Sequence, residues 1–435
     1  MISIPTPQEA MVLAMQQRLK QSECLTFKQR NHLQQRSVEA LLQHALMTVP
    51  YYQSHPEIKS MQGNLQWDKF PILTRTQLQK NEKELISTQP PAEHGSHIDF
   101  RSSGSTGRPV HTKSTEYSQI YWQALTLRDH LWAGRNMNGK LSAIKFLPDN
   151  KARYPGLNNN RWGTSTAALG FHAPSSLLNS SESLDVQYRW LCEQQPKYLV
   201  TYPSVLQELA KIQLRKKQLN SLHNVSCIGE NLPPSLRELV QQAFGCRVHD
   251  IYSSQEVGYM ALQCPKNNHY HVQLENCLLE ILDENNQPCV PGQMGRVVVT
   301  TLHNYLMPLI RYEIGDYAIP GSTCDCGISL PVLERIIGRT RNLVTYPDGS
   351  KSWPAYNPMA LMNLFPMASF QIEQLSTEEL QFNVQTSTKP SEEDCNQARK
   401  IICDAIGHNF TIHINQVPQL ARSSGGKFEE FISRI

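Results

Sequence analysis

A repeated alternation of short apolar runs and helical segments constrains the fold of this chain more than any other feature of its sequence. The runs are rich in β-branched and aromatic residues, and the segments between them have the apolar spacing of a helix. We expect strands at 198–202, 225–228 and 247–252, and helices at 203–213 and 233–244. Such alternation predicts an α/β fold with a mainly parallel sheet, whose ligands bind beyond the carboxyl ends of the strands.

The 435 residues are expected to form two domains. Residues 1–338 are predicted to form a large N-terminal domain, in which helices flank mainly parallel sheets. Within it, two strand-like runs around a Pro/Gly turn predict a β-rich subdomain over about 259–338. Residues 339–435 contain three strand-like runs and one helical segment, which predicts a small, mobile α+β domain.

Composition excludes several classes of partner. Lys and Arg total 41 and Asp and Glu total 38, so the formal net charge is only +3. So small a charge gives no reason to expect a nucleic acid or an anionic membrane as partner, and no apolar run approaches membrane-spanning length. The first residues lack the basic and apolar regions of a signal peptide. We therefore predict a cytoplasmic protein whose eleven cysteines are mostly reduced.

The stretch 101–109 combines four hydroxyl side chains, two glycines and two arginines. Glycine lets a ligand approach the backbone closely, and hydroxyl and amide groups donate hydrogen bonds, as a loop around an anionic triphosphate requires. A plain turn between two strands explains the same composition equally well. The spacing G-x-x-G, without a following G-K-[ST], excludes a Walker A loop.

Four further clusters could carry chemistry. Glu256 follows a predicted strand and could hold Mg²⁺, although a solvated loop glutamate is the simpler interpretation. Asp316 could accept hydrogen bonds from both hydroxyls of a ribose, or it could only shape a turn. The polar link 337–342 suits a hinge. Lys427 lies in a glycine-containing loop, from which it could reach a phosphate and a developing carboxylate charge.

In this order, the motifs resemble those of the adenylate-forming superfamily, which includes acyl-CoA synthetases, adenylation domains and luciferases. The nearest resemblance is to the phenylacetate–CoA ligase branch and its capsule-biosynthesis relatives. That branch also carries segments like Tyr51-Tyr52 and 70–74. The resemblance covers nearly the whole chain, and five motifs in the same order at suitable spacing make it specific.

The resemblance implies nucleotide-binding roles for three of these motifs. The ATP phosphates would be held by the loop residues Ser102, Ser103, Gly104, Ser105, Thr106 and Gly107. The segment packing beside adenine would be Gly229, Glu230 and Asn231. The counterpart of the Y-G-x-T-E motif would be Tyr252, Ser253, Ser254, Gln255 and Glu256. Within that motif, Tyr252 would lie against adenine and Glu256 would bind Mg²⁺.

The remaining motifs would complete the ATP site and allow the C-terminal domain to rotate between adenylate formation and acyl transfer. Asp316 matches the ribose-binding aspartate, and Arg339 matches the arginine near ribose and phosphate. Arg341 takes the position of the family's hinge. Lys427 matches the C-terminal lysine that stabilises adenylate formation, so the resemblance implies that Lys427 and Glu256 are the catalytic residues.

Four positions depart from the family pattern. Ser253 replaces the glycine of the Y-G-x-T-E motif, and Gln255 replaces its threonine, a usual phosphate contact. Arg108 stands for the usual lysine of the phosphate loop, and Asn342 stands for the aspartate after the hinge. These departures do not abolish the chemistry, but they allow a specialised or weakened ligase.

The cysteines suggest a metal site. Cys264, Cys324 and Cys326, with one histidine, would supply the Cys₃His set of a structural zinc site. The resemblance favours His271 over His269, because the histidine of this branch stands at that distance from the cysteine. Unligated thiols are the alternative. A zinc ion would tie the β-rich part together without acting in catalysis, since all four positions are filled.

The resemblance implies ATP-dependent activation of a carboxylic acid as acyl-AMP, followed by transfer to a thiol. CoA is the expected acceptor; the alternatives are a carrier-protein thiol, an amine, or a non-catalytic nucleotide-binding role. The acyl pocket would begin at Tyr202 and Pro203. An aryl or apolar acid is favoured by nearby aromatic residues, unless these belong to the core: Tyr121, Trp122, Trp132, Tyr154, Trp162 and Phe171. A homodimer is compatible with the sequence, which leaves the oligomeric state open.

Overall fold

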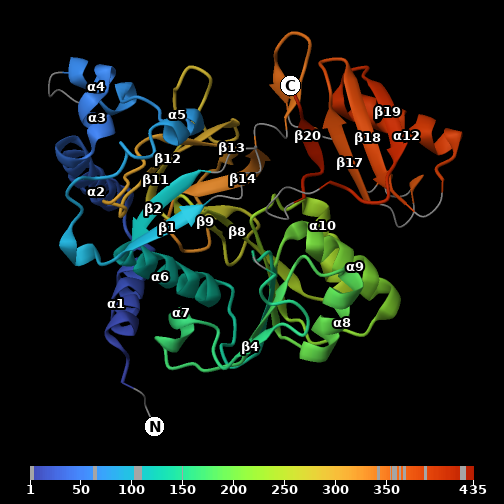
Figure 1. The fold of residues 1–435 in the computed structure, drawn as a ribbon, viewed down its shortest axis with the longest axis horizontal. Coiled ribbons are helices and arrows are strands. Elements are labelled where there is room, and N and C mark those ends of the chain that lie inside the picture. Colours follow the sequence, from blue (N-terminus) through green and yellow to red (C-terminus); the bar gives the residue numbers. More distant parts are fainter. Residues whose placement is uncertain are drawn as a thin grey trace.

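A mixed sheet of 12 strands forms the frame of the molecule (Figure 1). The computed structural model describes residues 4–61, 66–101, 110–148, 150–339, 343–352, 354, 360–361, 364–365, 369–386, 389–421 and 428–435. The strand order is β11-β12-β13-β14-β10-β9-β8-β7-β6-β3-β5-β4. Its parallel half consists of β3 (Leu141–Lys145), β5 (Ser175–Asn179), β6 (Tyr198–Thr201), β7 (Asn224–Ile228) and β8 (Arg247–Ser254), with β4 (Leu157–Asn159) antiparallel at the edge.

The other half of the same sheet is antiparallel. It consists of β9 (Gly258–Gln263), β10 (Tyr270–Val272), β11 (Cys277–Leu282), β12 (Gly295–Thr301), β13 (Tyr312–Pro320) and β14 (Val332–Arg339). The turn between β8 and β9 joins the two halves, because these strands pair antiparallel. The strands predicted for a β-rich subdomain therefore continue the main sheet instead of forming a sheet of their own.

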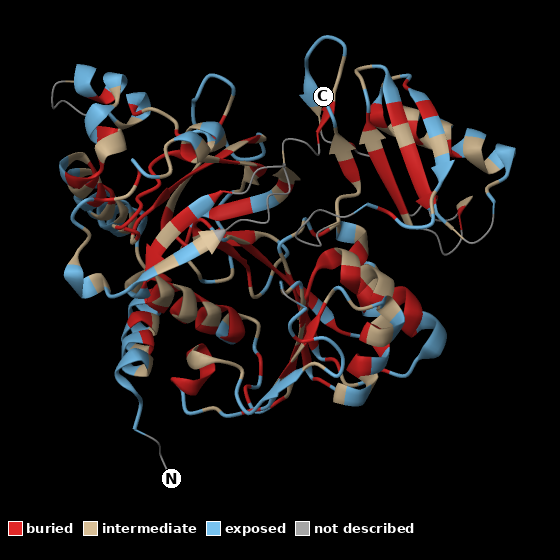
Figure 2. Cartoon of the chain, viewed as in Figure 1, coloured by how far each residue is buried: buried red, intermediate tan, exposed pale blue. Residues whose placement is uncertain are grey.

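Helices cover both faces of the sheet, and many residues of its strands are buried (Figure 2). One face of the parallel half is closed by α8 (Leu184–Gln194), α9 (Pro203–Lys216) and α10 (Pro234–Phe244). The opposite side carries α1 (Pro7–Ser22), α6 (Glu116–Trp132) and α7 (Thr164–Ala167). The antiparallel half packs against α2 (Phe27–Thr48), α3 (Pro50–Ser54), α4 (Pro56–Ser60) and α5 (Arg75–Lys80).

A separate two-stranded hairpin lies near α6. Its strands β1 (His97–Arg101) and β2 (His111–Thr115) pair antiparallel, with Arg101 opposite His111. The glycine- and hydroxyl-rich stretch therefore connects the ends of two paired strands, but residues 102–109 themselves lie outside the described part of the chain.

The C-terminal part has its own sheet and its own core, and it lies beside α9 and α10 (Figure 1). Its sheet has the order β19-β18-β17-β20. These strands are β17 (Ser369–Gln374), β18 (Glu379–Gln385), β19 (Thr411–Gln416) and β20 (Phe431–Ser433), and the helix α12 (Glu392–Ile406) packs against them. A short hairpin, β15 (Val344–Thr345) with β16 (Lys351–Ser352), precedes them.

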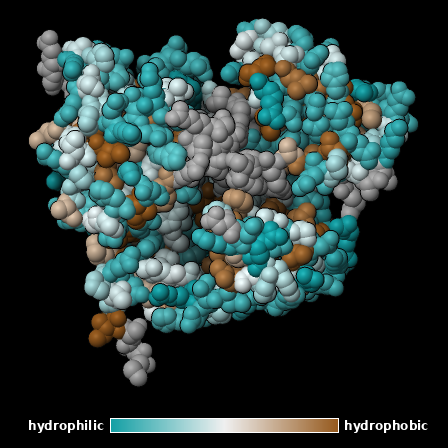
Figure 3. Space-filling model, viewed as in Figure 1, coloured by the Kyte–Doolittle hydropathy of each residue, from teal (hydrophilic) through white to brown (hydrophobic). Residues whose placement is uncertain are grey.

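The predicted α/β fold with a large mixed sheet and a small α+β C-terminal part is confirmed. The domain boundary near residue 339 stays a prediction. The molecular surface on the side shown in Figure 3 is mainly hydrophilic, with apolar residues in scattered groups. Within the described residues, no helix combines the length and the apolar character that crossing a membrane would require.

Candidate active site

The carboxyl end of β8 carries the counterpart of the predicted ATP motif. Tyr252 is buried within the strand, and the chain turns at residues 255–257 before β9 begins. The Val257 backbone N–H donates to the Ser254 hydroxyl over 3.1 Å, which holds this turn closed. Ser253 and Ser254 are half-buried and Gln255 is exposed, whereas Glu256 is buried.

Three of the predicted residues meet through direct contacts. The Tyr252 hydroxyl donates to the Asp316 carboxylate over 2.8 Å, and the Arg339 guanidinium Nε lies 2.9 Å from the other oxygen of the same carboxylate. Asp316 and Arg339 face each other in register on β13 and β14. Burial raises the pKa of the Tyr252 phenol, and Asp316 raises the pKa of Arg339, so the phenol stays protonated and the guanidinium charged. The arrangement offers a carboxylate, a phenol and a fixed cation at one edge of the sheet.

Glu256 contacts a residue that the sequence did not single out. Arg75, at the start of α5, places Nη1 3.7 Å from Glu256 Oε1, and both side chains are largely shielded from solvent. A cavity of about 40 Å³ adjoins Glu256 and is also lined by Phe100 and Thr112 of the β1–β2 hairpin. Glu256 therefore lies beside the β1–β2 hairpin, near the pair Phe100–Thr112 that precedes the glycine- and hydroxyl-rich stretch.

Glu230 joins the N-terminal sheet to the C-terminal end of the chain. It follows Gly229, whose φ of 74° lies in the left-handed region that glycine adopts without strain. The Glu230 carboxylate accepts hydrogen bonds from the Ser204 backbone N–H (2.9 Å), the Ser204 hydroxyl (3.1 Å) and the Phe428 backbone N–H (2.7 Å). Asn231 is exposed beside it. Phe428 directly follows Lys427 in the chain, so the contact fixes where the predicted lysine loop ends.

Several predicted residues lie outside the described part of the chain. They are Ser102, Ser103, Gly104, Ser105, Thr106, Gly107, Arg108, Arg341, Asn342 and Lys427. Their roles in binding phosphate, in the hinge and in catalysis stay predictions.

The segment predicted to begin the acyl pocket lies where β6 passes into α9. The buried Tyr202 precedes the helix, Pro203 is its first residue, and the Tyr202 hydroxyl accepts a hydrogen bond from the Phe146 backbone N–H over 3.1 Å. Most of the aromatic residues considered for the pocket instead belong to the cluster between α1, α6 and the sheet: Tyr121, Trp122, Trp132, Trp162 and Phe171. Tyr154 is exposed at the surface. Most of these aromatics thus pack against a core cluster, which weakens the preference for an aryl acid, although Trp122 also lines the cavity beside Glu256.

Cys264, His271, Cys324 and Cys326 come together between the β9–β10 turn and the loop before β14, with all their ligand atoms within 4.8 Å of one another. The sulfur atoms of Cys264 and Cys324 are 3.8 Å apart, which is too long for a disulfide. Tetrahedral zinc with Zn–S bonds of about 2.3 Å separates two sulfurs by about 3.8 Å. The donor set and its spacing therefore fit zinc.

Surrounding groups orient these ligands. His271 Nδ1–H donates to the Leu330 carbonyl over 3.2 Å, which leaves Nε2, 3.3 Å from the Cys326 sulfur, as the ligand atom. Burial lowers the pKa of His271 to about 4, so the imidazole is neutral, as metal binding requires. The backbone N–H groups of Cys326 and Ile328 donate to the sulfurs of Cys324 and Cys326, respectively, and would stabilise thiolates there.

Sequence reasoning missed two contributors to the site. Arg75 directly follows Thr74, the N-cap of α5, and only the fold brings it to Glu256. Phe428 contributes only its backbone N–H. Every residue except proline has this group, so the residue type gives no signal. The apolar segment 70–74 before Arg75 was the available signal, because Leu73 pairs with Tyr312 on β13, the strand that also carries Asp316.

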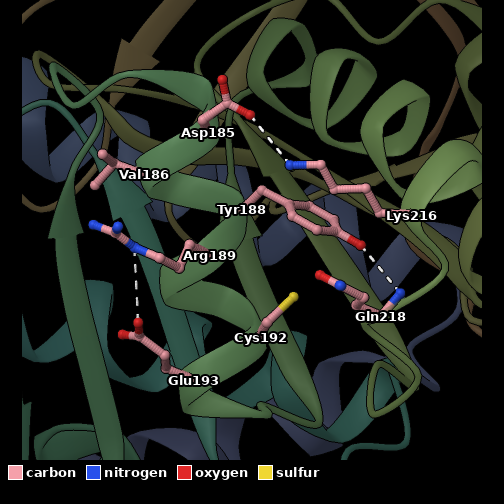
Figure 4. A pocket seen from close by; sticks show the side chains of 8 residues that line it. All are labelled: Asp185, Val186, Tyr188, Arg189, Cys192, Glu193, Lys216 and Gln218. Atoms are coloured by element: carbon pink, nitrogen blue, oxygen red, sulfur yellow. Dashed lines mark hydrogen bonds and ion pairs between the residues drawn. The ribbon is translucent and has the colours of Figure 1, made fainter.

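A groove of about 570 Å³ on another part of the surface lies between α8 and the end of α9 (Figure 4). Lys216 reaches Asp185 at 3.4 Å, and Arg189 reaches Glu193 at 3.8 Å. Both basic side chains at this groove are thus paired with acids, and it gathers none of the predicted site residues.

Comparison with known proteins gives the same family as the motifs. A family model described as AMP-binding enzyme matches residues 162–307. The phenylacetate–coenzyme A ligase of Thermus thermophilus is 23% identical over 332 residues, covering 72% of this chain and 71% of that protein. Protein CapK of Staphylococcus aureus is 21% identical over 291 residues, covering 64% of this chain and 60% of that protein.

Solved structures of the same fold extend the likeness over nearly the whole chain. A 2-hydroxyisobutyryl-CoA ligase in the postadenylation state superposes with a TM-score of 0.72 at 18% identity, covering 95% of this chain and 91% of that one. The same ligase in the thioesterification state gives 0.59 over the same shares. The AMP-binding family model and the sequence relatives confirm the resemblance to the adenylate-forming superfamily and its phenylacetate–CoA ligase branch. The fold is more similar to the postadenylation form.

Proposed function

We propose, from this likeness to adenylate-forming ligases, that the protein is an ATP-dependent acid–CoA ligase. The observation that carries the proposal is the contact of Tyr252, Asp316 and Arg339 at the carboxyl edge of the sheet, with Glu256 nearby. A scaffold protein would need none of these groups in this arrangement. Relatives named as phenylacetate–CoA and 2-hydroxyisobutyryl-CoA ligases support the same activity.

In the first step, a carboxylate oxygen of the acid would attack the α-phosphorus of ATP. A P–O bond to that oxygen forms, the P–O bond to pyrophosphate breaks, and acyl-AMP and pyrophosphate result. Tyr252 would lie against adenine, and Asp316 would accept from the ribose hydroxyls. Arg339 orients the Asp316 carboxylate through the contact of its Nε at 2.9 Å. Lys427 would approach the developing negative charge from the C-terminal loop.

Glu256 is the residue that would hold Mg²⁺. A buried carboxylate beside a cavity lined by the β1–β2 hairpin fits an ion that binds one or two carboxylates together with nucleotide phosphates. The ion would neutralise phosphate charge when bound. Arg75 supplies positive charge to Glu256 in the nucleotide-free protein.

In the second step, the thiol of CoA would attack the acyl carbonyl carbon. The C–S bond forms, the mixed anhydride C–O bond breaks, AMP leaves and the thiol proton is released. A rotation of residues 339–435 about Arg341 would withdraw Lys427 and open the thiol path. The direct contacts between the domains that would have to break include Glu230–Phe428 and the bond from the Ser369 hydroxyl to Glu208 (2.8 Å).

The test is acid-dependent exchange of pyrophosphate into ATP across a panel of aryl, aliphatic and amino acids. Exchange with at least one acid, and thioester formation when CoA is added, are the expected results. Acyl transfer only to a carrier-protein thiol or an amine would replace CoA as the acceptor. Absence of exchange with every acid, in protein that binds ATP, would favour a non-catalytic nucleotide-binding role.

We also propose that Cys264, His271, Cys324 and Cys326 hold a structural zinc ion. Their ligand atoms lie within 4.8 Å, and His271 is already oriented for binding through Nε2. Zinc would join the β9–β10 turn to the loop before β14 and would take no part in the reaction, because all four positions belong to the protein. A cytoplasmic location agrees with eleven cysteines of which none forms a disulfide, and cell fractionation would test it.

A further inference from the structure

The side chains on the two faces of the parallel half of the sheet differ in how completely they are buried. Ile144, Leu199 and Val225 point to one face and are almost completely buried against α8, α9 and α10. Side chains alternate between faces along a strand. The residues between these positions therefore point to the opposite face, on the side of α6.

On that opposite face, three neighbouring apolar residues remain partly reachable by solvent. Ala143 on β3 stands in register with Leu177 on β5 and with Val200 on β6, and all three are only half-buried. Interior strands of a sheet this wide normally bury such residues fully. The described residues thus leave these three side chains partly open to solvent, as a substrate site requires.

Lys145 lies on this same face, at the carboxyl end of β3. It is two residues beyond Ala143, and the next residue, Phe146, bonds through its N–H to the Tyr202 hydroxyl, where the acyl pocket is predicted to begin. The Lys145 carbonyl is engaged by the Ser180 N–H. Lys145 is therefore at the carboxyl edge of the sheet, where ligands of parallel sheets bind.

The charge of Lys145 is not compensated by the part of the chain that the structure describes. Other cations enclosed by this fold have acid partners: Arg128 lies 2.8 Å from Glu275, and Arg135 lies 2.6 Å from Asp129. For Lys145, the described residues provide no ion pair or side-chain hydrogen bond, and burial lowers its pKa. A partly buried cation that finds no anion among the described residues is costly unless a ligand supplies one.

We propose that Lys145 binds a second anionic group of the acid substrate, at the end remote from the carboxylate that is activated. The half-buried apolar residues Ala143, Leu177 and Val200 would contact the part of the substrate between the two charged ends. The substrate class is then a dicarboxylic acid or another acid with two anionic groups. This inference rests on the proposed function and specifies the acid that the site takes.

The test compares acids of matched shape that differ in the second charge, such as glutarate with valerate and terephthalate with 4-methylbenzoate. Pyrophosphate exchange gives kcat and KM for each acid with the wild type, Lys145→Met and Lys145→Arg. We expect the wild type to prefer the diacid of at least one pair by tenfold or more in kcat/KM. Lys145→Met should raise KM for that diacid at least tenfold without changing KM for ATP, and Lys145→Arg should retain part of the preference.

Lys140→Met is the matched control, because Lys140 lies at the opposite end of β3 and donates to Gln194 Oε1 over 2.7 Å. It should leave the preference unchanged. Lys145→Met should also melt at an equal or higher temperature than the wild type, since it removes an uncompensated charge. Equal activity on monoacids and diacids, or a change in KM for CoA or ATP alone, would overturn the assignment of Lys145. Failure of every acid to support exchange would refute the proposed ligase activity itself, and with it this inference.

Discussion

The backbone N–H of Phe428 donates to the Glu230 carboxylate over 2.7 Å, and this bond ties the C-terminal chain to the β7–α10 loop. The same carboxylate receives two hydrogen bonds from Ser204 at the start of α9. Glu230 therefore holds Phe428, the residue after Lys427, against the start of α9.

Glu230→Gln should slow adenylate formation selectively. An amide offers one acceptor oxygen in place of two and brings an N–H₂ group toward donors, which weakens bonds that are worth about 1.5–3 kcal/mol each when the acceptor is charged. We expect pyrophosphate exchange to fall by about tenfold or more, with little change in thioester formation from preformed acyl-AMP. Ser204→Ala is the control, since it removes one hydroxyl donor and leaves the Phe428 bond intact. Equal losses in both half-reactions would show that Glu230 has no selective role in positioning.

Arg75 should stabilise the nucleotide-free protein more than the nucleotide-bound one. Arg75→Met leaves the buried Glu256 carboxylate without this cation, at a cost of about 1–3 kcal/mol. Bound Mg²⁺ would replace the lost charge, so MgATP should raise the melting temperature of Arg75→Met more than that of the wild type. Arg75→Lys keeps the charge and should behave like the wild type. An identical MgATP shift in all three proteins would contradict the role of Glu256 as the Mg²⁺ ligand.

Zinc should be present at about one ion per chain if the four-residue cluster is a closed site. Cys326→Ser should lower the zinc content measured by mass spectrometry and reduce the free energy of unfolding by about 4 kcal/mol, because loss of a metal is among the largest single-site effects. Cys192→Ser is the matched control, as Cys192 is a half-buried cysteine on α8 outside the cluster. Metal-free wild type that melts at the same temperature as protein loaded with zinc would reject the site.

The sequence was most informative where structure is local. The apolar runs and helical spacing between residues 198 and 252 predicted β6, α9, β7, α10 and β8, because each of these elements is specified by its own residues. The continuation of the sheet into β9–β14 was not predictable in this way. It depends on β10 inserting between β9 and β14, with Tyr270 opposite both Gln263 and Leu333, and such pairings join segments far apart in sequence.

In the candidate site, too, the sequence revealed residue types but not the contacts between distant segments. Tyr252, Asp316 and Arg339 were found because their types and order match a known motif set, whereas their mutual contacts follow from the register of β13 and β14. Arg75 and Phe428 act through position alone, one by approaching Glu256 and the other through a backbone N–H. No local pattern reveals either contact.

Asp250 should make the protein less stable as the pH rises from about 4 to about 6. This carboxyl group is buried on β8, where it accepts a hydrogen bond from the Tyr270 hydroxyl over 2.6 Å. Burial raises its pKa from 3.8 to about 6. Between these two pH values the folded protein holds a proton that the unfolded chain has released, so the stabilisation present below pH 4 is lost as the pH rises through 6.

The loss amounts to about 2–3 kcal/mol, since one pKa unit corresponds to about 1.4 kcal/mol. Asp250→Asn cannot ionise but keeps an oxygen that can accept from Tyr270. The free energy of unfolding of wild type and of Asp250→Asn would be measured with urea from pH 4 to 7.5. The contributions of all other titrating groups cancel in the difference between the two proteins. That difference should shift by about 2–3 kcal/mol in favour of Asp250→Asn as the pH rises, and a difference independent of pH would contradict the raised pKa.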